Sequence, residues 1–234
     1  MKIKHAKGSS TERTLQHSKK FDKHKLFQFL LGSNVKEIFD VGANDGTTCQ
    51  ELKSLWPNAN IHCFEPQEEC WGEFAVNTAN FSGVHLQKFG LGSKTQTAAF
   101  YSHPMTTGQS GFNKLNAEST DSILLNSQLT SDQKESFLLD CNKERRIDVN
   151  TLDSYVNEHH ISQIDFLKID TQGYEIEILK GAKKSLPKVR LIQLEIMFYD
   201  FYERSLSFRE VEEVLHPHGF KLYDILTLSK NPMN

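Results

Sequence analysis

One stretch, Val-Lys-Glu-Ile-Phe-Asp-Val-Gly-Ala-Asn-Asp-Gly at positions 35–46, constrains the fold of this chain more than any other. The apolar run over 38–41 is typical of a buried β-strand. Gly42 and Gly46 bound a tight turn, and residues 47–55 then carry apolar side chains at helical spacing. A strand, a glycine-bounded turn and a helix form the first half of a nucleotide-binding βαβ unit. Ligands of such units lie beyond the carboxyl ends of the strands.

The composition of the turn indicates which ligand suits it. A dinucleotide fingerprint requires Gly-x-Gly-x-x-Gly, which rests a pyrophosphate on the helix N-terminus. Here the turn is Gly-Ala-Asn-Asp-Gly, with Asp40 before it and Asp45 inside it. Two carboxylates repel a phosphate and favour a cation, so S-adenosylmethionine, with its ammonium and sulfonium, fits better. An ordinary strand, turn and helix without a ligand stays open as the structural alternative.

A second strand is predicted over 60–64, and it ends in Glu65-Pro66. An acidic residue at the end of the second strand is placed to accept hydrogen bonds from a ribose diol. Pro66 ends the strand and starts the turn into the next helix. Glu65 could instead cap that helix, and both roles can hold together.

Three further strands extend the pattern, over 84–90, 164–170 and 189–196. The second of these is apolar along most of its length, as a central parallel strand should be. Asp170 ends that strand and Glu195 lies near the end of the next one. We therefore expect both carboxylates at the ligand-facing edge of the sheet.

Three motifs in order resemble the FkbM-type methyltransferases. They are Asp-Val-Gly-Ala-Asn-x-Gly from Asp40, Phe-Glu-Pro from Phe64, and Ile-Asp-Phe-Leu-Lys-Ile-Asp-Thr-Gln-Gly-Tyr-Glu from Ile164. The resemblance implies a single doubly wound, Rossmann-like α/β sheet of the class I methyltransferase type, with helices on both faces and strand order 3-2-1-4-5-6. A sixth strand is predicted over 219–228, after a helix over 207–215. No apolar segment remains for the family's last, antiparallel strand, so the sheet is expected to lack it, unless the natural protein is longer or another chain supplies it.

The resemblance also implies which residues contact S-adenosylmethionine. The turn after the third strand closes over the adenine in this fold, and the family has a serine-containing stretch near position 110. The predicted cofactor contacts are Asp40, Gly42, Ala43, Asn44, Gly46, Glu65, Pro66, Phe89, Gly90, Ser110 and Asp170. One departure concerns Gln172, because the family more often has a glutamate there.

Methyl transfer to a hydroxyl requires removal of a proton as the new bond forms. Asp170 and Glu195 are the candidate catalytic residues because both end central strands. Either could instead orient the acceptor, cap a helix or bind the cofactor's ammonium. Together with His103 they could form a metal site, but no metal is the expectation, and Lys168 is interpreted as structural.

Composition bounds the rest of the prediction. The net charge of −3 gives no general attraction to nucleic acid or membrane, and no apolar run is long enough to span a bilayer. Four cysteines without a Cys-x-x-Cys pair fit a reduced, cytoplasmic protein. Residues 1–20 are predicted to be a flexible tail. Residues 21–234 are predicted to form one domain, with a lid or substrate insert near 103–145.

The predicted function is therefore O-methylation of a hydroxyl on a sugar or secondary metabolite, as the resemblance implies. A small-molecule acceptor is the expected partner, and pairing of two copies of the chain stays open. Two alternatives remain. One is a protein of the same fold that binds S-adenosylmethionine without catalysis. The other is a nicotinamide-dependent oxidoreductase, which the absent third glycine disfavours.

Overall fold

The computed structural model describes residues 22–103, 106–116, 130, 135–136, 139–198, 201–204 and 206–227. The predicted tail over 1–20, and part of the predicted insert over 103–145, lie outside these ranges. Within them, no helix is long and apolar enough to cross a membrane.

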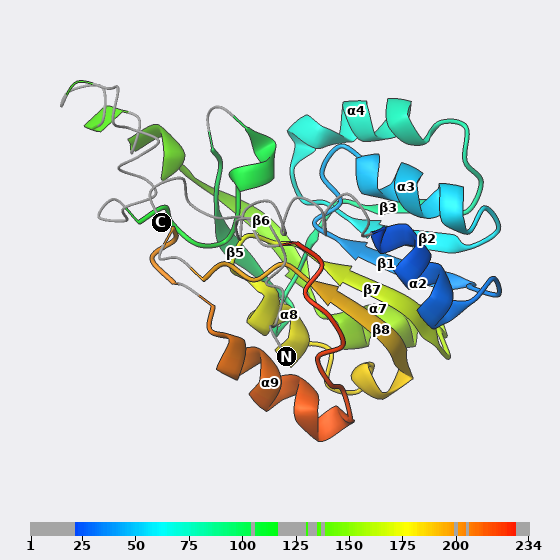
Figure 1. The fold of residues 1–234 in the computed structure, drawn as a ribbon. Helices are drawn as coiled ribbons and strands as arrows, with labels where there is room; N and C mark the ends of the chain where they lie inside the picture. Colours follow the sequence, from blue (N-terminus) through cyan, green and yellow to red (C-terminus); the bar gives the residue numbers. More distant parts are fainter. Residues whose placement is uncertain are drawn as a thin grey trace, which may run out of the picture.

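A five-stranded parallel sheet forms the centre of the molecule (Figure 1), with the order β3-β2-β1-β7-β8. Its strands are β1 Glu37–Val41, β2 Asn60–Phe64, β3 Val84–Gln87, β7 Ile164–Ile169 and β8 Val189–Leu194. Val41, the last residue of β1, lies opposite Phe64 on one side and Ile169 on the other. The carboxyl ends of the central strands therefore meet at one edge, as predicted.

Helices cover both faces of this sheet and divide the core into two layers (Figure 1). On one face lie α2 Lys23–Leu31, α3 Thr47–Leu55 and α4 Glu68–Thr78, and on the other α7 Leu152–Glu158, α8 Glu175–Lys180 and α9 Phe208–Leu215. Neighbouring β1 residues serve different layers, since Ile38 packs with the first set and Phe39 with the second. This alternation is what a strand buried on both faces requires.

Local signals explain where several helices begin. Thr151 accepts a hydrogen bond from the Ser154 amide at 3.0 Å and so caps α7. Ser207 and Glu210 form a capping box at the start of α9. Asp153 in α7 accepts bonds from two backbone amides of the 184–185 turn, which is a structural role.

A second, three-stranded sheet is inserted between β3 and α7. It consists of β4 Gly90–Leu91, β5 Gln96–Tyr101 and β6 Glu144–Asn150, in the order β4-β6-β5. Short 3-10 turns complete the described elements: η1 Thr107–Gln109, η2 Leu186–Lys188 and η3 His216–His218. The insert places β5 and the turn that follows it beside the carboxyl ends of β1 and β2, where the site described below is built.

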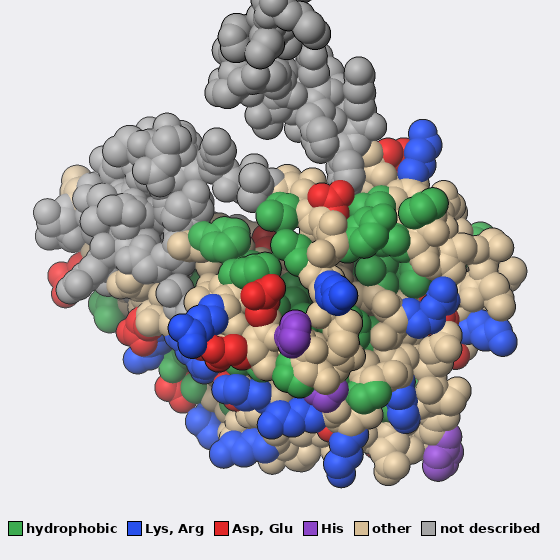
Figure 2. Space-filling model, turned by 60° about the horizontal axis from the view of Figure 1, so that its bottom comes forward, with side chains coloured by type: hydrophobic (Ala, Val, Ile, Leu, Met, Phe, Trp, Pro, Cys, Tyr) green, Lys and Arg blue, Asp and Glu red, His purple; other side chains and the backbone are tan. Residues whose placement is uncertain are grey.

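The predicted sixth strand was wrong over residues 219–227, which form no strand, while Leu228 lies outside the described residues. Leu222, Tyr223 and Ile225 in this segment are between 54% and 62% exposed. Because their side chains gain little burial, the apolar pattern gives no reason for the backbone to join the sheet. On the face shown in Figure 2, exposed hydrophobic side chains lie among Lys, Arg, Asp and Glu.

A buried histidine sits between the sheet and α7. His62 on β2 is 8% exposed, and its ring nitrogens lie 2.8 Å from the Tyr155 hydroxyl and 3.0 Å from a Glu37 carboxylate oxygen. Burial lowers the pKa of His62, although the hydrogen bond and charge of Glu37 oppose that shift.

This histidine should make the protein less stable in mild acid. The unfolded chain has a His pKa of about 6.5, so below that pH it binds more protons at this position than the folded chain. The free energy of unfolding should therefore fall as the pH drops through about 6.5 toward the lower folded-state pKa. Urea unfolding between about pH 5 and pH 8 measures this slope. His62→Gln should flatten it and the exposed His216→Gln should not; equal slopes in all three proteins would contradict the prediction.

Candidate active site

A cavity opens at the carboxyl edge of the main sheet, beside the inserted sheet. Its lining comes from the ends of β1, β2, β7 and β8 and from the segment around η1, with the residues Val41, Gly42, Asn44, Phe64, Glu65, Pro66, Gln67, Gly90, Leu91, Phe100, Thr107, Gly108, Ser110, Gly111, Phe112, Asp170, Thr171, Gln172 and Glu195. The charged side chains in this lining are Glu65, Asp170 and Glu195, and all three are acidic. The described part of the cavity is therefore electronegative.

The turn after β1 forms the floor of the cavity. Gly42 has φ +81°, and a Cβ placed on it would lie 1.9 Å from the Asp170 carbonyl oxygen. The Gly42 and Ala43 amides both donate to the Phe64 carbonyl. Asn44 is left-handed as well, with φ +45°. The conformation brings the chain close to the neighbouring strand ends, and only glycine fits at position 42.

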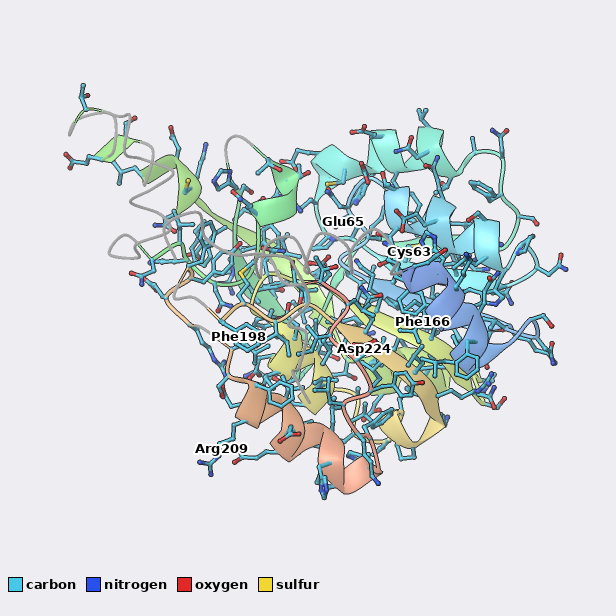
Figure 3. The ribbon with its side chains drawn as sticks, in the orientation of Figure 1. Cys63, Glu65, Phe166, Phe198, Arg209 and Asp224 are labelled. Carbon is cyan, nitrogen blue, oxygen red and sulfur yellow. The ribbon has the colours of Figure 1, made fainter. Side chains whose placement is uncertain are left out.

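Glu65 is held at the end of β2, near the start of α4 (Figure 3). One carboxylate oxygen accepts from the Asn44 amide and the other from the Gln67 amide, both at 2.8 Å. The residue is 3% exposed, and burial raises its pKa although the two amides counteract the shift. A carboxylate has about four acceptor positions, so Glu65 keeps capacity toward the cavity while its orientation is fixed.

A buried ion pair lies beneath the floor. The Lys168 ammonium is 3.1 Å from Asp40 Oδ1 and 3.4 Å from Asp170 Oδ2. Burial opposes its charge, but the two carboxylates hold the pKa of Lys168 above its ordinary value. Burial raises the pKa of Asp40 in spite of Lys168. Lys168 thus ties the end of β7 to β1, which agrees with the structural role predicted for it.

Asp170 and Glu195 meet at the far wall through Gln172. The Gln172 amide nitrogen lies 3.1 Å from Asp170 Oδ1 and 2.9 Å from Glu195 Oε2. Loss of hydration, followed by the hydrogen bond and charge of Asp170, raises the pKa of Glu195 to about 8. Glu195 still borders solvent, so part of this effect is screened.

The pKa of Asp170, the neighbouring carboxylate, is shifted in the opposite direction. Burial works against the charge of Asp170, but hydrogen bonds with Glu195 and Gln172 and the charge of Lys168 hold its pKa below the ordinary value. The pair can therefore keep one proton on Glu195 while Asp170 stays ionised.

The η1 segment closes the near side of the cavity. The Gln67 side chain donates to the Thr107 carbonyl at 3.1 Å, and the Thr107 hydroxyl donates to the Asn44 side chain at 2.8 Å. Ser110 accepts from the His103 amide at 3.0 Å. These bonds connect the inserted sheet to the turns after β1 and β2, so both sides of the cavity are part of one network.

Most residues proposed from the sequence line this cavity: Gly42, Asn44, Glu65, Pro66, Gly90, Ser110, Asp170 and Glu195. Four do not. Asp40 and Ala43 are buried below it, Gly46 packs close to Phe74 of α4, and Phe89 packs against the core on the α7 face. Their contact with a cofactor stays a prediction.

Sequence reasoning missed several lining residues, among them Gln67, Phe100, Thr107 and Phe112. Gln67 follows the Phe-Glu-Pro motif by one position, which is a usable signal. Phe100 lies on β5 of the inserted sheet, and nothing in its spacing places it at this edge. Thr107 and Phe112 lie in the insert predicted near 103–145 as a lid or substrate segment, but neither residue was singled out from the sequence.

No group of three or more His, Cys, Asp or Glu in the described ranges is arranged to hold a metal ion. The alternative cluster of Asp170, Glu195 and His103 is therefore not formed as a ligand set there.

Comparison with known proteins agrees with the resemblance seen in the sequence. The family model described as "Methyltransferase FkbM domain" matches residues 40–222. A 2-O-methyltransferase, NoeI of Sinorhizobium fredii, is 24% identical over 82% of this chain and 76% of its own. The methyltransferase sdnD of Sordaria araneosa is 28% identical over 79% of this chain and 73% of its own. The 31-O-demethyl-FK506 methyltransferase FkbM of Streptomyces tacrolimicus is 25% identical over 78% of this chain and 72% of its own.

Proposed function

The chain belongs to the FkbM methyltransferase family, and from that premise we propose that it transfers the methyl group of S-adenosylmethionine to a hydroxyl oxygen of a sugar or secondary metabolite. The observation that carries the cofactor assignment is the cavity lining, whose charged members are all carboxylates. Relatives named as O-methyltransferases support the choice of oxygen as acceptor.

The residues present fit the proposed cofactor. S-adenosylmethionine carries a sulfonium and an ammonium and no phosphate, so an electronegative cavity favours it over a dinucleotide. Glu65, fixed by two backbone amides, is placed to accept from the ribose hydroxyls. Phe64, Leu91 and Phe100 supply apolar surface for a base. We assign the nucleoside to the side of the cavity near Glu65.

The far wall then receives the acceptor. When bound, the cofactor supplies an electrophilic methyl group: the acceptor oxygen takes the methyl carbon, and the electron pair of the broken carbon–sulfur bond stays on sulfur. The oxygen must also lose its proton. Glu195, with a pKa raised to about 8, is suited to accept that proton, because a general base works best with a pKa near the operating pH. Asp170 stays ionised and orients the acceptor hydroxyl.

Two other functions are not favoured. A nicotinamide-dependent oxidoreductase would place its pyrophosphate against carboxylates, which costs electrostatic energy. A protein that only binds S-adenosylmethionine is less favoured, because the relatives are named as methyltransferases and two adjacent carboxylates with pKa values shifted in opposite directions are typical of catalytic sites.

The proposal is tested by product release. Purified protein is incubated with S-adenosylmethionine and a panel of neutral methyl glycosides and hydroxylated aglycones, and S-adenosylhomocysteine is measured. We expect acceptor-dependent release with at least one member. Heat of binding with NAD but not with S-adenosylmethionine would overturn the proposal.

A binding variant tests the role of Glu65. Glu65→Gln should weaken S-adenosylmethionine binding by about tenfold, because a charged acceptor at the ribose is replaced by a neutral one and one oxygen becomes a donor. Calorimetry measures the change. Glu68→Gln, on the exposed start of α4, is the control and should bind normally. Unchanged affinity in Glu65→Gln would remove the ribose assignment.

A further inference from the structure

A hydrogen-bonded chain connects the two carboxylates to segments far apart in the sequence. Gln172 faces Asp170 and Glu195 through its amide nitrogen, and its side-chain oxygen lies 3.0 Å from the Tyr202 hydroxyl. The same hydroxyl lies 2.9 Å from the Gln109 carbonyl oxygen. A hydroxyl has one proton, so it donates to one of these two oxygens at a time.

Gln172 and Tyr202, the two central residues of this hydrogen-bonded series, are held in place by the surrounding structure. Gln172 has φ +58°, a left-handed conformation that few residues other than glycine adopt without support. Tyr202 is 3% exposed. It forms a bridge with Leu115, and the neighbouring Phe201 carbonyl accepts from the Asn116 amide at 2.9 Å. The left-handed backbone at Gln172 and the buried hydroxyl of Tyr202 therefore hold the Gln172 side chain in one orientation.

We propose that Gln172 is a positioning residue for the catalytic carboxylates, and that Tyr202 fixes its amide so that the nitrogen faces both of them. This inference rests on the proposed function, which assigns proton removal to Glu195 and orientation of the acceptor hydroxyl to Asp170. Gln172 itself does not touch the acceptor proton. It acts by holding the two carboxylates at a set separation.

The chemistry explains why an amide suits this position. An amide nitrogen has two hydrogens, so it can donate one to each carboxylate at once. Such bonds favour the ionised form of each acid, and in this site they lower the pKa of Asp170 and oppose the upward shift of Glu195. A carboxylate at position 172 would add negative charge instead of donors. The glutamine is therefore compatible with catalysis, and the departure from the family pattern does not by itself indicate an inactive site.

The test follows Glu195 directly and needs no acceptor. Protein labelled with ¹³C at glutamate carboxyl carbons is titrated by NMR, and the Glu195 signal is identified by its loss in Glu195→Gln. Gln172→Met keeps the length of the side chain and removes both donors. It should move the titration midpoint of Glu195 upward by about one pH unit, the size expected for one hydrogen bond to a charged group. Tyr202→Phe should move it in the same direction by less, because the amide is then free to turn.

Controls separate this role from simple damage. Tyr101→Phe makes the same chemical change outside the chain of hydrogen bonds and should leave the midpoint in place. Calorimetry with S-adenosylmethionine on each variant reports the proposed function separately. If the unmodified protein binds S-adenosylmethionine and the Glu195 midpoint is unchanged in Gln172→Met, this inference alone is overturned. If Gln172→Met does not fold, the midpoint in Tyr202→Phe decides in the same way. Absence of heat in the unmodified protein would overturn the proposed function, whatever the midpoints show.

Discussion

Replacing Gly42 by alanine is expected to lower the free energy of unfolding by about 2–5 kcal/mol and to abolish binding of S-adenosylmethionine. The added Cβ would lie 1.9 Å from the Asp170 carbonyl oxygen, at a backbone φ of +81°. The contacted atom belongs to the backbone of a neighbouring strand end, so no side chain can turn away to relieve the overlap. The turn itself must move, and with it the floor of the cavity.

Urea unfolding and calorimetry measure the two effects of Gly42→Ala. Gly72→Ala is the matched control, because Gly72 lies in α4 and a Cβ there meets nothing within 4 Å. That variant should be more stable by roughly 0.5–1 kcal/mol, as an alanine is in an exposed helix. If Gly42→Ala were as stable as the unmodified protein and still bound the cofactor, the close approach of the two strand ends would not be required for stability or for binding.

Replacing Glu195 by glutamine is expected to lower kcat by about 10²–10⁴-fold, the usual contribution of a general base. The affinity for S-adenosylmethionine should change little, since Glu195 lies on the acceptor side. In the unmodified protein kcat/KM should rise with pH through about 8, because the base works only after it loses its proton and its pKa is raised to that value. The variant should lose this dependence.

Rates of methyl transfer between about pH 6 and pH 9.5 test this, with the acceptor identified by product release. Glu203→Gln, an exposed carboxylate close in sequence, is the control and should keep both rate and pH profile. A fall in kcat of less than fivefold for Glu195→Gln would assign the proton to another group. Asp170, the other candidate, would then be the next residue to replace.

The sheet could be predicted well because its signals are local. β2 has the predicted bounds, since an apolar run is cut off by Glu65-Pro66, and β7 follows from an apolar stretch ending at Asp170. The segment over 219–227 has a similar content of apolar residues, yet it forms no strand. Composition does not report whether the edge of a sheet accepts another strand, so the same pattern gave a wrong prediction there.

The residues of the candidate site could likewise be predicted only in part. Glu65, Asp170 and Glu195 were found because parallel strands bring their carboxyl ends together, so position along a strand predicts position in the cavity. Thr107 and Phe112 lie in the insert that was predicted as a lid or substrate segment, but which of its residues reach this edge depends on tertiary contacts that no periodicity encodes. Asp40 has the expected sequence position but is buried outside the cavity lining, where it lies opposite Lys168 in the β1–β7 register and forms an ion pair with it.

The two sides of the cavity have separate origins in the chain. The proposed nucleoside side is built by the turns after β1 and β2 together with Leu91 and Phe100 of the inserted sheet, whereas Asp170, Gln172 and Glu195 on the acceptor side follow β7 and β8. Under the proposed function, substitutions after β7 and β8 should change which hydroxyl is accepted with less effect on how S-adenosylmethionine is held. If both sides are as proposed, related proteins could differ in their acceptors while holding the methyl donor in the same way.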